Sequence, residues 1–173
     1  MKVFKNCKIL IVIGCLANPT VSFASPTPFG FEVGKTRIEE INKKFEFDEI
    51  IENAYLGWNH WVKNSEKLKD EKYHSANFIV NEDGLLVGMI LYGDKENFNK
   101  EIEFFKSKFN IVSIKTPKVG TKKAIFKDNN LNEAEVTVNY SKQGKIPQYI
   151  MEILIASPEL IEEYNKGEKG QKK

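Results

Sequence analysis

Cysteine is scarce in this sequence: only Cys7 and Cys15 carry a thiol among 173 residues. Both precede Ser25, where we expect the mature chain to begin. Without them, the mature chain can form no disulfide and has neither a thiol nucleophile nor a thiolate metal site. Its stability must therefore come from ordinary packing, for which residues 25–173 are long enough to bury a sizeable core.

Long apolar runs are also lacking. The apolar run at residues 9–13 is only five residues long, and Asn18 and Pro19 interrupt the segment that follows it. A helix needs roughly 20 apolar residues to cross a bilayer. The rest of the sequence contains no apolar run of that length either, so we expect no transmembrane span in the mature chain.

The first 24 residues have the pattern of a secretory signal peptide. Lys2, Lys5 and Lys8 form a basic start, the apolar run follows, and Ser22-Phe23-Ala24 places small residues before a cleavage point. This pattern predicts a periplasmic or secreted protein. Alternatively, Val12-Ile13-Gly14-Cys15 resembles a lipoprotein box, in which Cys15 would be lipidated and the protein would be an outer-membrane lipoprotein.

An excess of charge of one sign is absent as well. The whole chain has 26 basic and 24 acidic residues, but three of the lysines and none of the acids lie in the leader. The mature chain is therefore close to neutral. Nucleic-acid binding proteins usually show a strong basic excess, so we expect no nucleic-acid partner.

The hydrophobic pattern predicts a single α+β domain over residues 25–166, followed by a disordered tail over 167–173. Alternation predicts strands at 29–33, 76–80, 85–92, 111–114, 124–127, 134–140 and 149–156. Helical spacing predicts helices at 37–45 and 98–109, and a short C-terminal helix begins near Pro158. Because short turns join most of the strands, the sheet should be mainly antiparallel, with one or two helices packed on one face. Residues 46–73 show no clear pattern, and the two halves of the chain resemble each other in element order.

Two local motifs support this prediction. Thr36 and Glu39 have the spacing of a capping box at the start of the first helix. Asn81-Glu82-Asp83-Gly84 has the composition of a hairpin turn between two strands.

The run Trp58-Asn59-His60-Trp61 is the most unusual cluster of the mature chain. If it forms a strand, Trp58 and His60 point to one face, and Asn59 and Trp61 point to the other. Such large aromatic residues either close a core or anchor a partner, because tryptophan is frequent at binding hot spots. We take Trp58, His60 and Trp61 as the candidate binding residues.

Motifs for catalysis, metal and cofactor binding are weak or missing. Three residues separate Gly30 from Gly34, whereas a phosphate loop needs four. The calcium-loop pattern that starts at Asp128 lacks its glycine and its final glutamate. We expect no cofactor and no metal site. Two alternatives remain: a small hydrolase that uses His60 or His74 with a carboxylate, and a carrier with an enclosed cavity for a small apolar ligand.

The run Gly34-Lys35-Thr36-Arg37-Ile38-Glu39-Glu40-Ile41 resembles the start of small envelope proteins of the BamE and β-lactamase-inhibitor-protein type. The resemblance covers eight residues. It implies an α+β envelope protein that acts by binding other proteins. Together with the missing catalytic motifs, it favours a non-enzymatic protein-binding module, such as an inhibitor, an immunity-type protein or an assembly factor, whose partner is another envelope or secreted protein.

Overall fold

The computed structural model describes residues 28–63, 65–130, 132–141 and 148–171, with side chains up to residue 139 and again from 150 to 166. The expected signal peptide over 1–24, the alternative lipidation of Cys15 and the last two residues of the chain lie outside this description. Within the described ranges, no helix is long and apolar enough to cross a membrane.

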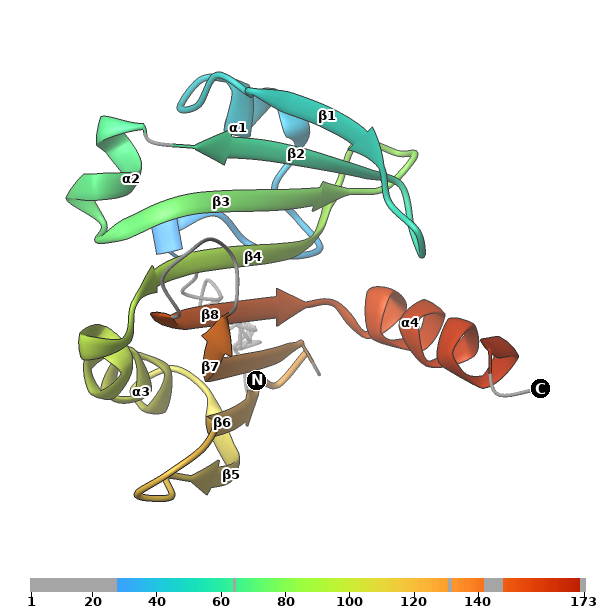
Figure 1. Ribbon diagram of the computed structural model, residues 1–173. Coiled ribbons are helices and arrows are strands. Elements are labelled where there is room, and N and C mark those ends of the chain that lie inside the picture. The colour runs from blue at the N-terminus through green and yellow to red at the C-terminus, as the bar shows by residue number, and fades with distance from the viewer. Residues whose placement is uncertain (1–27, 64, 131, 142–147, 172–173) are drawn as a thin grey trace, which may run out of the picture.

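Eight antiparallel strands form one sheet in the order β1-β2-β3-β4-β8-β7-β6-β5 (Figure 1). In chain order, the elements of the first half are η1 Pro28–Gly30, α1 Ile38–Asn42, β1 Glu49–Glu52, β2 Trp58–Lys63, α2 Glu66–Asp70, β3 Tyr73–Val80 and β4 Leu86–Asp94. Those of the second half are η2 Lys95–Asn97, α3 Phe98–Lys106, β5 Asn110–Lys115, β6 Lys122–Lys127, β7 Glu133–Ser141, β8 Gln148–Ala156 and α4 Pro158–Gln171.

The two halves have the same architecture, because in each of them a helix precedes four strands. The strands of each half lie side by side in the sheet, and the halves meet where the last strand of each, β4 and β8, pair with each other. Leu91 lies opposite Ile153 at the centre of this pairing. The strand order therefore reads the same from both edges of the sheet.

One side of the sheet, here called the core face, is buried. Its central row of directly opposed residues crosses six strands and consists of Val62, Ala76, Leu91, Ile153, Val136 and Ala124. None of these six is more than 2% exposed. Ile41 of α1, Leu68 of α2 and Phe105 of α3 belong to the same buried cluster. The core of the domain therefore lies on this face of the sheet.

The opposite side, here called the open face, is only partly covered. The row of directly opposed residues next to the central core-face row points to this open face. It consists of Trp61, Asn77, Ile90, Leu154, Glu135 and Ile125. All of these except Asn77 are partly exposed. Leu160 and Ile161 of α4 pack on one end of this face with Ile79 and Val87, and Figure 1 shows α4 continuing beyond the end of β8.

The α+β class and the mainly antiparallel sheet are confirmed. The strands expected at 76–80, 85–92, 124–127, 134–140 and 149–156 are confirmed as β3, β4, β6, β7 and β8, and the amphipathic helix after residue 98 is α3. The stretch 46–73, which showed no pattern, contains β1, β2 and α2. α4 extends to Gln171 and so includes most of the segment expected as a tail.

Two local predictions were wrong. Residues 29–33 do not form a strand: Phe29 has a φ of 69° within η1, and the rings of Phe29 and Phe31 pack into the aromatic core instead. The helix cap is also displaced by one residue, because the Arg37 amide donates to Glu40 Oε1 at 3.2 Å. The Thr36 hydroxyl instead accepts a 2.7 Å hydrogen bond from the Glu32 amide, in the turn before the helix.

Gly57 is required by its surroundings. It has a φ of +63°, and a Cβ there would overlap the Val80 carbonyl oxygen. Gly57→Ala should therefore lower the free energy of unfolding by about 2–4 kcal/mol, since both backbone strain and a close contact oppose it. Urea denaturation followed by circular dichroism measures the loss.

Gly30→Ala is the matched control. Gly30 has a φ of +76°, and a Cβ added there would meet nothing within 4 Å, so this variant should lose only the backbone term of about 1–2 kcal/mol. Equal losses in the two variants would show that the approach of Val80 to Gly57 does not constrain the fold.

Candidate functional site

The structure divides the aromatic cluster on β2 between two faces. Trp58 and His60 lie on the core face, opposite Val80 and Phe78, whereas Trp61 lies on the open face opposite Asn77. The alternation expected for a strand is thus confirmed. The three candidate binding residues do not share one surface, and their role in binding remains a prediction.

Trp58 lies at an exposed edge of the core face. Its side chain is 47% exposed, and Ile50 of the edge strand β1, on the same face, is 55% exposed. Ile50 lies opposite His60, which makes it a diagonal neighbour of Trp58. These two side chains therefore form a small apolar surface at the edge of the sheet.

His60 is packed into the protein interior. It is 9% exposed, and its ring lies 4.8 Å from the ring of Phe47. Its Nδ1 is buried without a hydrogen-bond partner, and desolvation by burial lowers the pKa of His60 below the ordinary value. A largely buried imidazole beside an aromatic ring contributes to packing and exposes little surface to a partner.

Trp61 belongs to an aromatic pair on the open face. Its ring stacks with that of Tyr92 from β4, with a centroid distance of 6.2 Å and an interplanar angle of 16°. The Lys63 ammonium lies 5.8 Å from the centre of the indole ring. Two strands, β2 and β4, thus contribute to one aromatic surface across the intervening strand β3.

Tyr92 connects this pair to a carboxylate. Glu152 of β8 lies directly opposite Tyr92 and accepts a hydrogen bond from its hydroxyl. Burial raises the pKa of Tyr92 to about 12, with the charge of Glu152 as a further cause. Burial also raises the pKa of Glu152, and the neighbouring Glu135 adds to this effect.

Near Glu152, a lysine partly neutralises the negative charge of the open face. Glu135 of β7 forms an ion pair with Lys123 at 2.6 Å. The Tyr92 hydrogen bond favours the ionised form of Glu152 but is outweighed by burial. The open face therefore presents an aromatic pair beside a carboxylate that is incompletely compensated.

Asparagines support the position of Trp61 from the first half of the sheet. Asn77 Nδ2 and Asn53 Nδ2 both donate to Asn59 Oδ1, at 2.8 and 2.9 Å. Asn77 is 2% exposed, and its Oδ1 is buried without a partner. These hydrogen bonds connect β2, β3 and the loop after β1 on the same face of the sheet as Trp61.

The hydrolase hypothesis requires a histidine and an acid within hydrogen-bond reach in a cleft. His74 Nε2 lies 2.9 Å from Asp94 Oδ1, but both side chains are more than half exposed. The pair thus has the required distance on an open surface, without the enclosure that organises a catalytic site. His60, the other histidine, lies on a different strand and is buried against Phe47.

The carrier hypothesis requires an enclosed apolar cavity. Three hollows on the described part of the chain have volumes of about 500, 370 and 280 Å³, and each is open to solvent. Among the described residues, no group of three histidine, cysteine or acidic side chains is placed to hold a metal ion. Comparison of the chain with protein-family models, curated proteins and solved structures finds no match.

The sequence pattern indicated Trp61 but neither Tyr92 nor Glu152. The apolar pattern of 85–92 indicated a central strand, but it did not indicate which strands flank it. The pairing of Tyr92 with Glu152 depends on β4 meeting β8, a strand far along the chain. Glu152 itself interrupts an otherwise apolar strand, and this is the local signal that could have found it.

Glu152 makes stability depend on pH. Because its folded-state pKa is raised above the unfolded value, its contribution is most favourable at low pH and is lost as the pH rises through the folded pKa. Glu152→Gln keeps an acceptor for Tyr92 and removes the charge. It should raise the free energy of unfolding at pH 7 by about 0.5 kcal/mol, a value discounted for solvent screening of a partly exposed group.

The measurement is urea denaturation of both proteins between pH 4 and pH 8, where their difference should shrink toward pH 4. Glu133→Gln is the control, because Glu133 lies on β7 in an ion pair with Lys127 at 3.4 Å. That variant should show no gain at pH 7. A Glu152→Gln protein less stable than the parent at pH 7 would refute an unfavourable burial of the charge.

Proposed function

We propose that this chain is an exported, non-enzymatic protein-binding module whose partner docks on the open face around Trp61 and Tyr92. Such a module acts as an inhibitor, an immunity-type protein or an assembly factor. The observation that carries the proposal is the contrast between the two central rows of the sheet. The core-face row is buried, whereas the open-face row contains partly exposed Trp61, Ile90 and Leu154.

The composition of this surface supports a protein partner. Tryptophan and tyrosine are enriched among the residues that carry most of the binding energy of interfaces. Trp61 and Tyr92 lie on strands rather than loops, so the surrounding hydrogen-bonded ladder holds their backbones before a partner arrives. A surface that is already ordered loses less conformational entropy on binding.

Charge indicates which side chain of the partner enters this surface. Glu152 lies beside the aromatic pair with a raised pKa, and Glu135 lies near it. An arginine or lysine of the partner would compensate Glu152 and could also lie against an aromatic ring. We therefore expect a partner segment that presents a basic side chain to the open face.

The compartment assigned in this proposal rests on the leader pattern of residues 1–24. Export, an almost neutral mature chain and the absence of recognised catalytic motifs in the sequence all favour a partner in the envelope or among secreted proteins. The short resemblance to BamE-type and β-lactamase-inhibitor-type proteins has the same implication.

The test is crosslinking in the native host. The full chain is expressed with a photoreactive phenylalanine analogue at Ile90, which is on the open face of β4 near Tyr92, or at Ile50, which is on the exposed edge of the core face. The open-face position should crosslink one defined protein, and the core-face position should not. Crosslinking from Ile50 alone would refute the assignment to the open face.

Affinity measurements with the captured partner then test individual residues. Trp61→Ala should weaken binding by about 30-fold or more, corresponding to about 2 kcal/mol for a hot-spot tryptophan. Trp58→Ala removes the same side chain from the opposite face and should change the affinity less than threefold. Thermal unfolding of both variants checks that they remain folded. If neither variant binds more weakly, the aromatic pair is not the binding site.

A further inference from the structure

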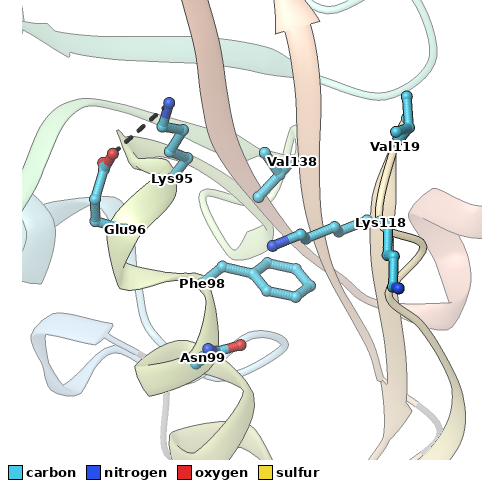
Figure 2. A pocket seen from close by; sticks show the side chains of 9 residues that line it. Lys95, Glu96, Phe98, Asn99, Lys118, Val119 and Val138 are labelled. Atoms are coloured by element: carbon cyan, nitrogen blue, oxygen red, sulfur yellow. Dashed lines mark ion pairs between the residues drawn. The ribbon is translucent and has the colours of Figure 1, made fainter.

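A hollow of about 500 Å³ lies in the second half of the protein, away from the proposed docking surface. Figure 2 shows Lys95 and Glu96 on one wall, Lys118 and Val119 on the opposite wall, and Phe98 and Val138 between them. The walls come from the start of the η2–α3 segment and from the turn between β5 and β6. The volume is within the range typical of small-molecule sites.

The charge of this hollow is strongly positive. Among the described residues that line it, three are lysines, Lys95, Lys118 and Lys122, and one is an acid, Glu96, whose carboxylate lies 3.8 Å from the Lys95 ammonium. Lys122 lies over the Phe98 ring at 5.8 Å. Within the described part of the chain, neither Lys118 nor Lys122 forms an ion pair with a carboxylate.

The surrounding sequence reinforces this observation. Residues 104–127 contain seven lysines and no aspartate or glutamate, although the whole chain has nearly equal numbers of basic and acidic residues. Lys123 and Lys127 are paired with Glu135 and Glu133 of β7. Lys118 of the β5–β6 turn and Lys122, the first residue of β6, instead line the hollow.

We propose that this hollow binds a phosphate group, carried by either a soluble phosphate ester or a lipid headgroup. Its lining has two positive charges in excess, and a phosphate monoester carries about −1.5 to −2 charges at pH 7. Lysine binds phosphate as a point charge without a fixed bidentate geometry, so ammonium groups from opposite walls can converge on one anion. Phe98 and Val138 supply an apolar floor for the organic part of the ligand. This site does not depend on the proposed function.

The soluble source is tested by isothermal titration of the purified protein with inorganic pyrophosphate at 0.15 M salt. The Lys118→Gln/Lys122→Gln variant should bind at least tenfold more weakly than the parent. The control is Lys108→Gln/Lys115→Gln, which removes the same charge from the same acid-free stretch outside the hollow and should bind within twofold of the parent. Equal weakening in both variants would overturn the proposal, since it would indicate non-specific attraction.

The lipid source is tested by co-sedimentation with vesicles of phosphatidylcholine containing one-fifth phosphatidic acid, against pure phosphatidylcholine. Binding that requires phosphatidic acid, is lost in Lys118→Gln/Lys122→Gln and is competed by pyrophosphate would support a headgroup ligand. Pyrophosphate binding without vesicle binding would support a soluble ester. Citrate that binds as tightly as pyrophosphate, or no binding of either phosphate probe, would overturn the assignment to phosphate.

Discussion

The pairing of β4 with β8 is the constraint on which the rest of the structure depends. It joins two four-stranded halves into one sheet and continues the buried row of the core face from Leu91 to Ile153. The same pairing brings Tyr92 opposite Glu152 on the other face. A change of register by one residue would exchange the two faces of β8 and place Glu152 in the core. The hydrophobic core and the candidate site are thus determined by one register.

Burial on one side of the sheet explains why the two faces differ. Side chains from α1, α2 and α3 fill the core face, while α4 packs on one end of the open face. Gly88 permits this packing, because a Cβ at that position would overlap Leu160 Cδ2. The rest of the open face keeps partly exposed side chains on a rigid sheet. Such a surface can meet a partner without reorganising its backbone.

Local patterns predicted the elements, and non-local pairings determined the site. The hairpin of β3 and β4 and the amphipathic helix α3 are encoded by residues close in sequence, so alternation and helical spacing were sufficient to find them. The division of Trp58 and Trp61 between two faces followed from strand alternation alone. The contact of Trp61 with Tyr92 did not, because it requires knowing that β2 and β4 lie on either side of β3. The strand β1 could not be predicted from the sequence, because this edge strand is exposed throughout and has no buried alternation.

The two halves repeat an architecture but differ in chemistry. The first half contributes Trp61 and Tyr92, beside the carboxylates that β7 and β8 add to the open face. The second half contains the acid-free stretch 104–127, in which Lys123 and Lys127 pair with β7, whereas Lys118 and Lys122 line the hollow beside Phe98. A net charge near zero therefore does not reveal the lysines gathered at the hollow or the carboxylate of Glu152 on the open face. Because separate surfaces with different charges attract different ligands, the placement of charge on the sheet indicates where charged ligands can bind, which the net charge of the whole chain does not.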